Sequence, residues 1–282
     1  MSGPLSFGFS GSSWLLSYEL GAASAIQHEF RPEVMEQCTF LGSQTGCIPA
    51  VALAFGLDAE AIQEEFTFLA QRNSRYFLGG KLNQIASLIK PLLEKWIPQD
   101  ISCLGNRLVI SLTEYPSGKE RKVSLFKNKQ DLIDHILASC SLPLIGKYHV
   151  KSRDDGMLLV GNSYSKTRKL APTKDSITIT IQPFYGSANI CPNFDNYEVA
   201  QEWWSTSDSS FYETIFDDGY LDTTEFIMKK TNSGYLSTNL FPPVEYKVAS
   251  PPASDFAPKV VPKKSIAQKA YNLLKNINPF TA

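Results

Sequence analysis

The sequence lacks the signals of a secreted or membrane-spanning chain. Its start, MSGPLSFGF, has neither a basic segment nor a long apolar core, so we expect no secretory signal. No apolar run reaches the roughly 18 residues that a helix needs to span a bilayer. The five cysteines are odd in number, scattered and without a C-x-x-C pair, which favours reduced, mostly buried thiols. We therefore expect a soluble or peripherally attached protein of the cytoplasm.

The sequence also has no excess of one charge and no cluster of metal ligands. Its 27 basic and 28 acidic residues nearly cancel, and no basic stripe stands out in the first 250 residues, so nucleic acid is not an expected partner. His28, His135 and His149 are isolated, without a partner at ligand spacing, so we expect no metal and no other cofactor. With 282 residues, 43% of them hydrophobic, the chain suits a globular domain with a sizeable core.

Strand and helix patterns alternate along most of the chain. Strands are predicted at residues 5–9, 38–41, 107–115, 120–126, 157–160 and 176–184. Helices are predicted at residues 14–30, 47–55, 59–73, 82–96 (interrupted by Pro91), 131–140, 198–204 and 208–230. This alternation predicts a three-layer α/β/α domain over residues 1–240, with a central, mostly parallel sheet. Residues 241–264 are rich in proline and read as a linker.

Residues 265–282 follow this linker and contain a short basic amphipathic pattern. The apolar residues of the pattern recur at helical spacing, while Lys269 lies off their stripe. Such a helix is typical of attachment to a lipid headgroup layer. It could equally fold back onto the domain or remain a frayed tail. The candidates for contact with a lipid surface are Ile266, Lys269, Leu273, Leu274 and Ile277.

The stretch TFLGSQTGC, residues 39–47, has the form of a nucleophile elbow without a nucleophile. A short apolar strand leads into a turn framed by Gly42 and Gly46, and a helical run begins at Cys47. In an elbow of the form G-x-S-x-G, the central serine attacks the substrate. Here the central residue is Gln44. Taken alone, two glycines at this spacing are a weak signal, because many α/β proteins turn from strand to helix in this way.

Further segments give the elbow a context. They are, in chain order, FSGSSWLLSYELG (9–21), GSQTG (42–46), LVISLT (108–113) with ILASCSLP (136–143), ITITIQPFYG (177–186) ending in ICP (190–192), and GYLD (219–222). Together they resemble the patatin-like phospholipase domain family, and within it the animal branch that contains adipose triglyceride lipase and adiponutrin. The resemblance covers roughly residues 5–232 and implies a patatin-like α/β fold.

The resemblance also implies where the catalytic groups of the family should lie. Family members cleave acyl esters with a Ser–Asp dyad, whose serine falls on Gln44 and whose aspartate falls on Gly161. A carboxamide nitrogen cannot attack an ester, and glycine has no carboxylate to accept a proton. In the glycine-rich oxyanion loop Gly11 matches, whereas Ser12 and Ser13 replace expected glycines. The resemblance therefore implies a degenerate member of the family.

We expect from this a pseudoenzyme of lipid metabolism rather than an enzyme. It would bind lipid, the surface of a lipid droplet or of the endoplasmic reticulum membrane, or an active lipase or its co-activator protein. The alternative is an active lipid acyl hydrolase, of triacylglycerol lipase or phospholipase type, that uses a non-standard serine: Ser43, Ser12 or Ser13. Asp155-Gly156 imitates the family's Asp-Gly motif, but it precedes the strand at 157–160 and is interpreted as a solvated turn.

Overall fold

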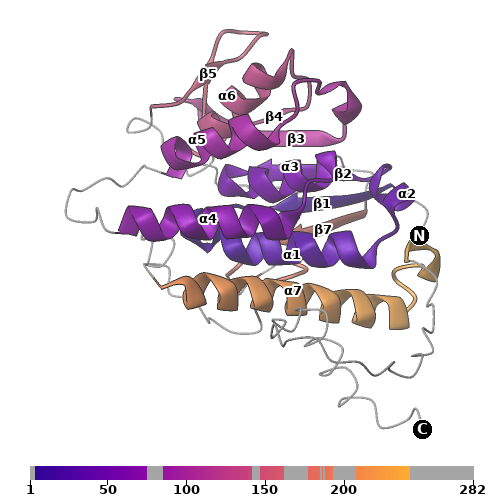
Figure 1. Cartoon of the computed structure of the whole chain (residues 1–282). Coiled ribbons are helices and arrows are strands. Elements are labelled where there is room, and N and C mark those ends of the chain that lie inside the picture. The colour runs from indigo at the N-terminus through magenta and orange to yellow at the C-terminus, as the bar shows by residue number, and fades with distance from the viewer. Residues whose placement is uncertain are drawn as a thin grey trace, which may run out of the picture. The chain divides into compact units, whose positions relative to one another are not determined.

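The computed structural model describes residues 4–74, 85–141, 147–161, 177–184, 186, 188–192 and 208–241 (Figure 1). All of them belong to the first of two compact units, Met1–Phe241. The second unit, Pro242–Ala282, lies outside the described residues. The predicted linker beyond Phe241, the terminal helix with its lipid-surface candidates and the helix expected at 198–204 therefore stay predictions.

A seven-stranded sheet forms the centre of the described structure. Its order is β5 (Val150–Lys151), β6 (Leu158–Val160), β3 (Leu108–Tyr115), β2 (Thr39–Ser43), β1 (Leu5–Phe9) and β7 (Ile177–Ile181), with β4 (Glu120–Val123) also paired to β3. The strands β3, β2, β1 and β7 are parallel, and the pairs formed by β4, β5 and β6 are antiparallel. The predicted α/β fold with a central, mostly parallel sheet is confirmed.

The register of β3 places the end of β6 beside the elbow. Thr113 pairs with Glu120 of β4 and with Val160 of β6, so these two strands lie on opposite edges of β3. Ser111 pairs with β4 on one edge and with Ser43 of β2 on the other. Thus β6 pairs with the same edge of β3 as β2 does, beyond the point where β2 ends. Because β6 is antiparallel to β3, it runs toward the carboxyl end of β2.

Seven α-helices flank this sheet within the described residues. They are α1 (Leu16–Glu29), α2 (Pro32–Met35), α3 (Cys47–Phe55), α4 (Ala59–Ser74), α5 (Ile85–Trp96), α6 (Lys129–Ser139) and α7 (Ser209–Asn232). Gly56, at φ +68°, ends α3, and the Asp58 carboxylate accepts the first N–H groups of α4, which agrees with the predicted helices at 47–55 and 59–73. Contrary to expectation, α5 continues through Pro91, which lies on its exposed side.

The helices α1 and α7 lie against each other through bare backbone (Figure 1). A Cβ atom at Gly219 would lie 2.0 Å from the Tyr18 carbonyl oxygen, and one at Gly21 would lie 2.0 Å from the Phe216 carbonyl oxygen. The Tyr18 hydroxyl donates to Asp222 at 2.7 Å across the same crossing. Glycine is therefore required at both positions for this close approach.

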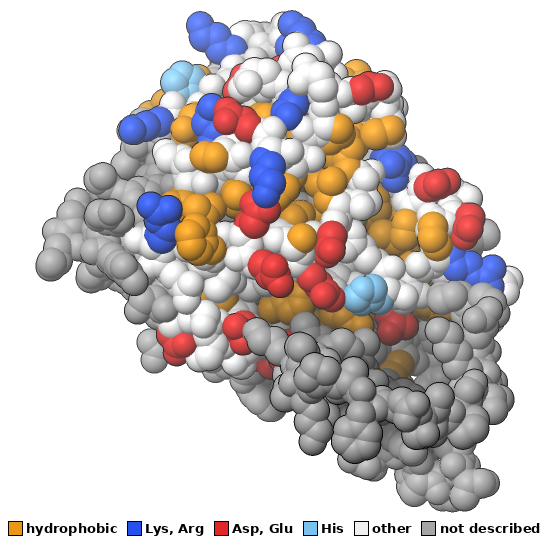
Figure 2. All heavy atoms as spheres, viewed as in Figure 1, with side chains coloured by type: hydrophobic (Ala, Val, Ile, Leu, Met, Phe, Trp, Pro, Cys, Tyr) orange, Lys and Arg blue, Asp and Glu red, His pale blue; other side chains and the backbone are white. Residues whose placement is uncertain are grey.

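Figure 2 shows acidic and basic side chains interspersed on the face viewed.

Candidate functional site

The strand, turn and helix predicted for residues 39–55 are present, with Gln44 at the tip of the turn. Strand β2 ends at Ser43, a short 3-10 turn spans Gln44–Gly46, and α3 follows. Gln44 has φ +53°, a left-handed conformation that is strained for a side chain of this kind and typical of a nucleophile elbow. A Cβ at Gly42 would lie 2.3 Å from the Cys47 Cα, so this turn needs its glycine.

Hydrogen bonds from neighbouring elements hold the tip in place. The Gln44 N–H donates to the Ser139 hydroxyl at 2.8 Å, and that hydroxyl donates to the Ser111 carbonyl at 2.8 Å. The Gln44 side chain is half-buried. The geometry of the elbow is thus maintained by contacts with α6 and β3 that need no hydroxyl at position 44.

The two serines of the oxyanion loop donate their N–H groups to a side chain of the elbow. The Ser12 and Ser13 N–H groups donate to the Thr45 hydroxyl oxygen at 3.0 and 2.9 Å. An oxyanion hole needs such N–H groups directed at the reacting carbonyl oxygen. The Thr45 hydroxyl occupies these donors in the described structure.

The two residues before these serines are also engaged within the fold. The Ser10 N–H donates to the Ile181 carbonyl at 3.1 Å, and the Gly11 N–H donates to the Glu19 carboxylate at 3.0 Å. Glu19 is fully buried, and the Ser10 hydroxyl is 3.3 Å from the same carboxylate oxygen. Every N–H group from residue 10 to residue 13 therefore has an internal acceptor, and a carboxylate lies behind the loop.

Gly161 follows β6, at the end of that strand that runs toward the elbow. Its N–H donates to the Ser141 carbonyl at 3.1 Å. A Cβ at this position would lie 2.3 Å from the Ser141 carbonyl oxygen and 2.5 Å from that of Ser139. Real Cβ atoms do not approach backbone oxygens so closely. The position to which the resemblance assigns the catalytic aspartate is thus too narrow for any side chain.

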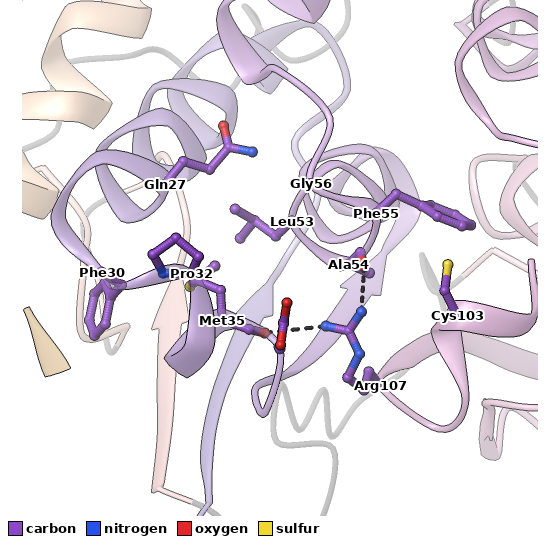
Figure 3. Close-up of a pocket in the computed structure, with 11 residues that line it drawn as sticks. Gln27, Phe30, Pro32, Met35, Leu53, Ala54, Phe55, Gly56, Cys103 and Arg107 are labelled. Carbon is purple, nitrogen blue, oxygen red and sulfur yellow. Dashed lines mark hydrogen bonds between the residues drawn. The ribbon is translucent and has the colours of Figure 1, made fainter.

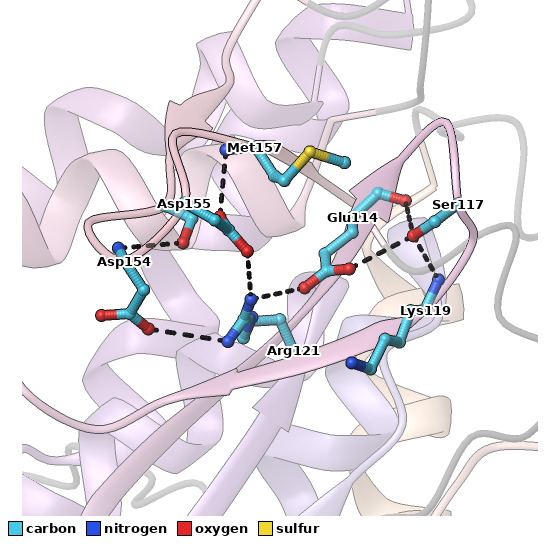
Figure 4. A network of polar contacts seen from close by, with 8 residues as sticks. Glu114, Ser117, Lys119, Arg121, Asp154, Asp155 and Met157 are labelled. Carbon is cyan, nitrogen blue, oxygen red and sulfur yellow. Dashed lines mark hydrogen bonds and ion pairs between the residues drawn. The ribbon is translucent and has the colours of Figure 1, made fainter.

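Asp155 precedes β6 and takes part in a network of ion pairs (Figure 4). The Arg121 guanidinium lies 2.8 Å from Asp155, 2.6 Å from Glu114 and 3.6 Å from Asp154. Hydrogen bonds from Ser152 and the Met157 N–H, together with Arg121, hold the pKa of Asp155 below its ordinary value. This network ties the turn between β5 and β6 to the hairpin of β3 and β4, which is a structural role.

The candidate substitute serines differ in their accessibility. Ser43 and Ser12 are fully buried, and Ser13 is half-buried with φ +52°. A hydroxyl without contact with solvent cannot meet a substrate unless the fold opens. The geometry therefore favours Ser13 over the other two as a reactive group, although its N–H is already directed at Thr45.

Cys47 begins α3, where a helix dipole would lower the pKa of a thiol. Instead, burial raises the pKa of Cys47 to about 12, against an opposing hydrogen bond with Ser139. The thiol is therefore an unreactive part of the core, as the sequence interpretation expects. Within the described ranges, no three His, Cys, Asp or Glu residues are placed to hold a metal ion. None of the helices described there is long and apolar enough to cross a membrane.

Sequence reasoning considered Thr45 only as a displaced nucleophile, and it missed both the role of Thr45 as an acceptor for the oxyanion loop and the buried carboxylate of Glu19. A lone acid within the apolar stretch WLLSYELGAASAI is a signal that could have indicated a buried carboxylate at Glu19. Thr45 accepts hydrogen bonds from residues more than 30 positions away, so no local pattern predicts this role.

Comparison with known proteins agrees with the resemblance. No family model matches the chain. The mouse 1-acylglycerol-3-phosphate O-acyltransferase Pnpla3 is 28% identical over 191 residues, which are 66% of this chain and 45% of that protein. The bovine patatin-like phospholipase domain-containing protein 2 is 29% identical over 65% of this chain and 38% of its own length.

A third relative, the mouse omega-hydroxyceramide transacylase, is 24% identical over 67% of this chain and 32% of its own length. The chain thus spans less than half the length of the curated relatives it matches. The curated relatives of this chain are thus patatin-like phospholipase domain proteins of the animal adiponutrin-like branch, similar to it at 24–29% identity over about two thirds of its length.

Proposed function

We propose that this chain is a catalytically inactive patatin-like protein that acts in lipid metabolism by binding. The observation that carries the proposal is Gln44 at the tip of the elbow, in the left-handed conformation of a nucleophile. Its carboxamide nitrogen shares its lone pair with the carbonyl group and does not attack esters. Loss of a nucleophile of this type costs on the order of a millionfold in turnover.

Two further features support the absence of catalysis. Gly161 offers no carboxylate, and the space beside it is closed by the carbonyl oxygens of residues 139 and 141. The N–H groups of residues 10–13 all donate to internal acceptors, so a developing oxyanion finds no donor in this loop. Loss of a single oxyanion donor costs about 100- to 1,000-fold in turnover. Nucleophile, base and electrostatic stabilisation are therefore all compromised.

The names of the relatives indicate the class of ligand. They describe an O-acyltransferase of 1-acylglycerol-3-phosphate, an omega-hydroxyceramide transacylase and a protein with a patatin-like phospholipase domain. We infer that this chain acts in the cytoplasm and binds acyl lipids. It would bind them either as single molecules or at the surface of a lipid droplet or the endoplasmic reticulum membrane. Active lipases or their co-activators are the alternative partners.

The purified full chain is expected to show no esterase chemistry. We expect no labelling by a serine-directed fluorophosphonate probe and no release of fatty acid from triacylglycerol or phospholipid. An active member of the family, assayed in parallel, provides the reference rate. Stoichiometric labelling that disappears in Ser43→Ala, Ser12→Ala or Ser13→Ala would establish the alternative, an acyl hydrolase with a non-standard serine.

Recruitment to lipid is expected to depend on the apolar stripe predicted in the terminal segment. The double change Leu273→Glu and Leu274→Glu in the full chain should reduce flotation with lipid droplets by at least fivefold, because it removes apolar side chains from the stripe. The matched control, Asn272→Glu with Asn276→Glu, adds the same charge off the stripe and should float like the unchanged chain. Equal flotation of both double variants would argue against this mode of attachment.

A further inference from the structure

A cavity of about 360 Å³ lies away from the elbow, where α1, α2 and α3 approach the start of β3 (Figure 3). Its walls are mainly apolar and include Phe30, Pro32, Met35, Leu53 and Phe55. This volume is at the lower end of the range of roughly 300 to 1,000 Å³ that small-molecule sites occupy. The lining thus suits a compact apolar ligand.

One cationic side chain, Arg107, completes this lining. Its guanidinium donates to the Ala54 carbonyl at 2.7 Å and to the Met35 carbonyl at 3.2 Å, as Figure 3 shows. Both acceptors are neutral carbonyls in the last turns of α2 and α3, whose partial negative charge offsets the full positive charge of Arg107 only in part. Among the described residues, no carboxylate oxygen lies within 4.0 Å of this guanidinium.

None of the other polar groups described near the cavity forms an ion pair with Arg107. Burial raises the pKa of Cys38 to about 12 even though Arg107 opposes the shift, so this thiol stays neutral. The Gln27 carboxamide holds the turn before α4 through Leu57 and Ala59. Glu36 also lines the cavity, but it is exposed and forms no ion pair with Arg107 within the described structure.

We propose that this cavity binds the carboxylate of a medium-chain fatty acid. The alkyl chain would lie against the apolar wall, and the carboxylate would accept N–H groups of Arg107 that Met35 and Ala54 do not use. A guanidinium has five such donors and pairs well with a carboxylate. Apolar walls with one cationic end are complementary to a molecule that has one anionic end.

This site is separate from the elbow. Helix α3 begins directly after the elbow and reaches the cavity with its last residues, a length of about 13 Å for nine residues. Along β3, Arg107 precedes by four residues the position that is level with the elbow, Ser111, which again gives about 13 Å. The proposal therefore does not depend on whether the elbow binds lipid.

Calorimetric titration of the full chain with decanoate, below its micelle concentration, tests the proposal. We expect saturable binding of decanoate and at least tenfold weaker binding of decanol, which has a similar chain and no charge. Arg107→Met should weaken decanoate binding at least tenfold. Because Arg107 also holds two backbone carbonyls, Leu53→Trp serves as a second variant that fills the cavity and should abolish binding.

The exposed Glu36 supplies a variant with the opposite sign and little risk to folding. Glu36→Gln removes a negative charge from the lining and should strengthen decanoate binding by about twofold to fivefold. Gln44→Ala, at the elbow, should leave the affinity unchanged. Absence of decanoate binding, equal binding of decanol, or an affinity that Glu36→Gln lowers or leaves unchanged would overturn the assignment without touching the proposal for the elbow.

Discussion

Gly219→Ala is expected to lower the free energy of unfolding by about 3 kcal/mol, through overpacking of the contact between α7 and α1. The new Cβ would lie 2.0 Å from the Tyr18 carbonyl oxygen and 2.8 Å from its carbonyl carbon, both of them backbone atoms. Helix propensity alone predicts the opposite, a gain of about 1 kcal/mol for alanine over glycine. Urea unfolding followed by circular dichroism measures the difference.

Thr214→Ala is the matched control for this change, because Thr214 lies on an exposed position of the same helix. It should change stability by no more than about 0.5 kcal/mol. Gly21→Ala, on the opposite side of the crossing, should reproduce the loss, since its Cβ would meet the Phe216 carbonyl oxygen at 2.0 Å. A Gly219→Ala variant as stable as the unchanged chain would mean that the two helices do not lie in backbone contact.

The second large effect concerns the acid that the resemblance places at position 161. Gly161→Asp is expected to destabilise the fold by about 3 kcal/mol or more, because its Cβ would overlap the carbonyl oxygens of Ser141 and Ser139. The double variant Gln44→Ser with Gly161→Asp should therefore not regain catalysis. We expect its ester hydrolysis to stay on the order of a millionfold below that of an intact relative.

The single variant Gln44→Ser shows the effect of the new hydroxyl without the effect of the new aspartate. It puts a small hydroxyl at the tip of the elbow and leaves the contacts around Gly161 unchanged, so stability should change by less than about 1 kcal/mol. Hydrolysis of p-nitrophenyl butyrate by the purified variants gives the activity. A folded double variant with a clear rise in turnover would show that the carbonyl oxygens move aside readily and that only two side chains separate this chain from an esterase.

Much of the fold could be predicted from the sequence because its signals are local. The hairpin of β3 and β4 follows from two β-rich runs joined by Pro116-Ser117-Gly118-Lys119, and the end of α3 follows from Gly56. The elbow follows from Gly42 and Gly46, which permit strand and helix to meet. Local patterns of this kind identify elements, and the resemblance adds the α/β fold, whereas the order of the strands comes from the structure.

The remainder depends on contacts between distant segments. Pro91 was expected to interrupt a helix, yet α5 continues because the residue lies on the exposed side. The Thr45 hydroxyl finds its donors in a loop more than 30 residues earlier, and the space around Gly161 is defined by residues 139–141. The cavity beside Arg107 is lined by residues of α1, α2 and α3 and by Cys103 and Arg107, which no local pattern brings together. Such features follow only from the assembled fold.

The internal hydrogen bonds of the loop at residues 10–13 have a consequence for recognition. In an esterase the N–H groups at this end of the sheet attract negative charge. Here these N–H groups donate to acceptors within the protein, and the Glu19 carboxylate lies behind them. A ligand at the elbow would therefore be selected by its shape and by its contacts with the neutral carboxamide of Gln44. Under the two proposals, the elbow end of the sheet would select a ligand by shape, and the far end, with the cation Arg107, would select it by negative charge.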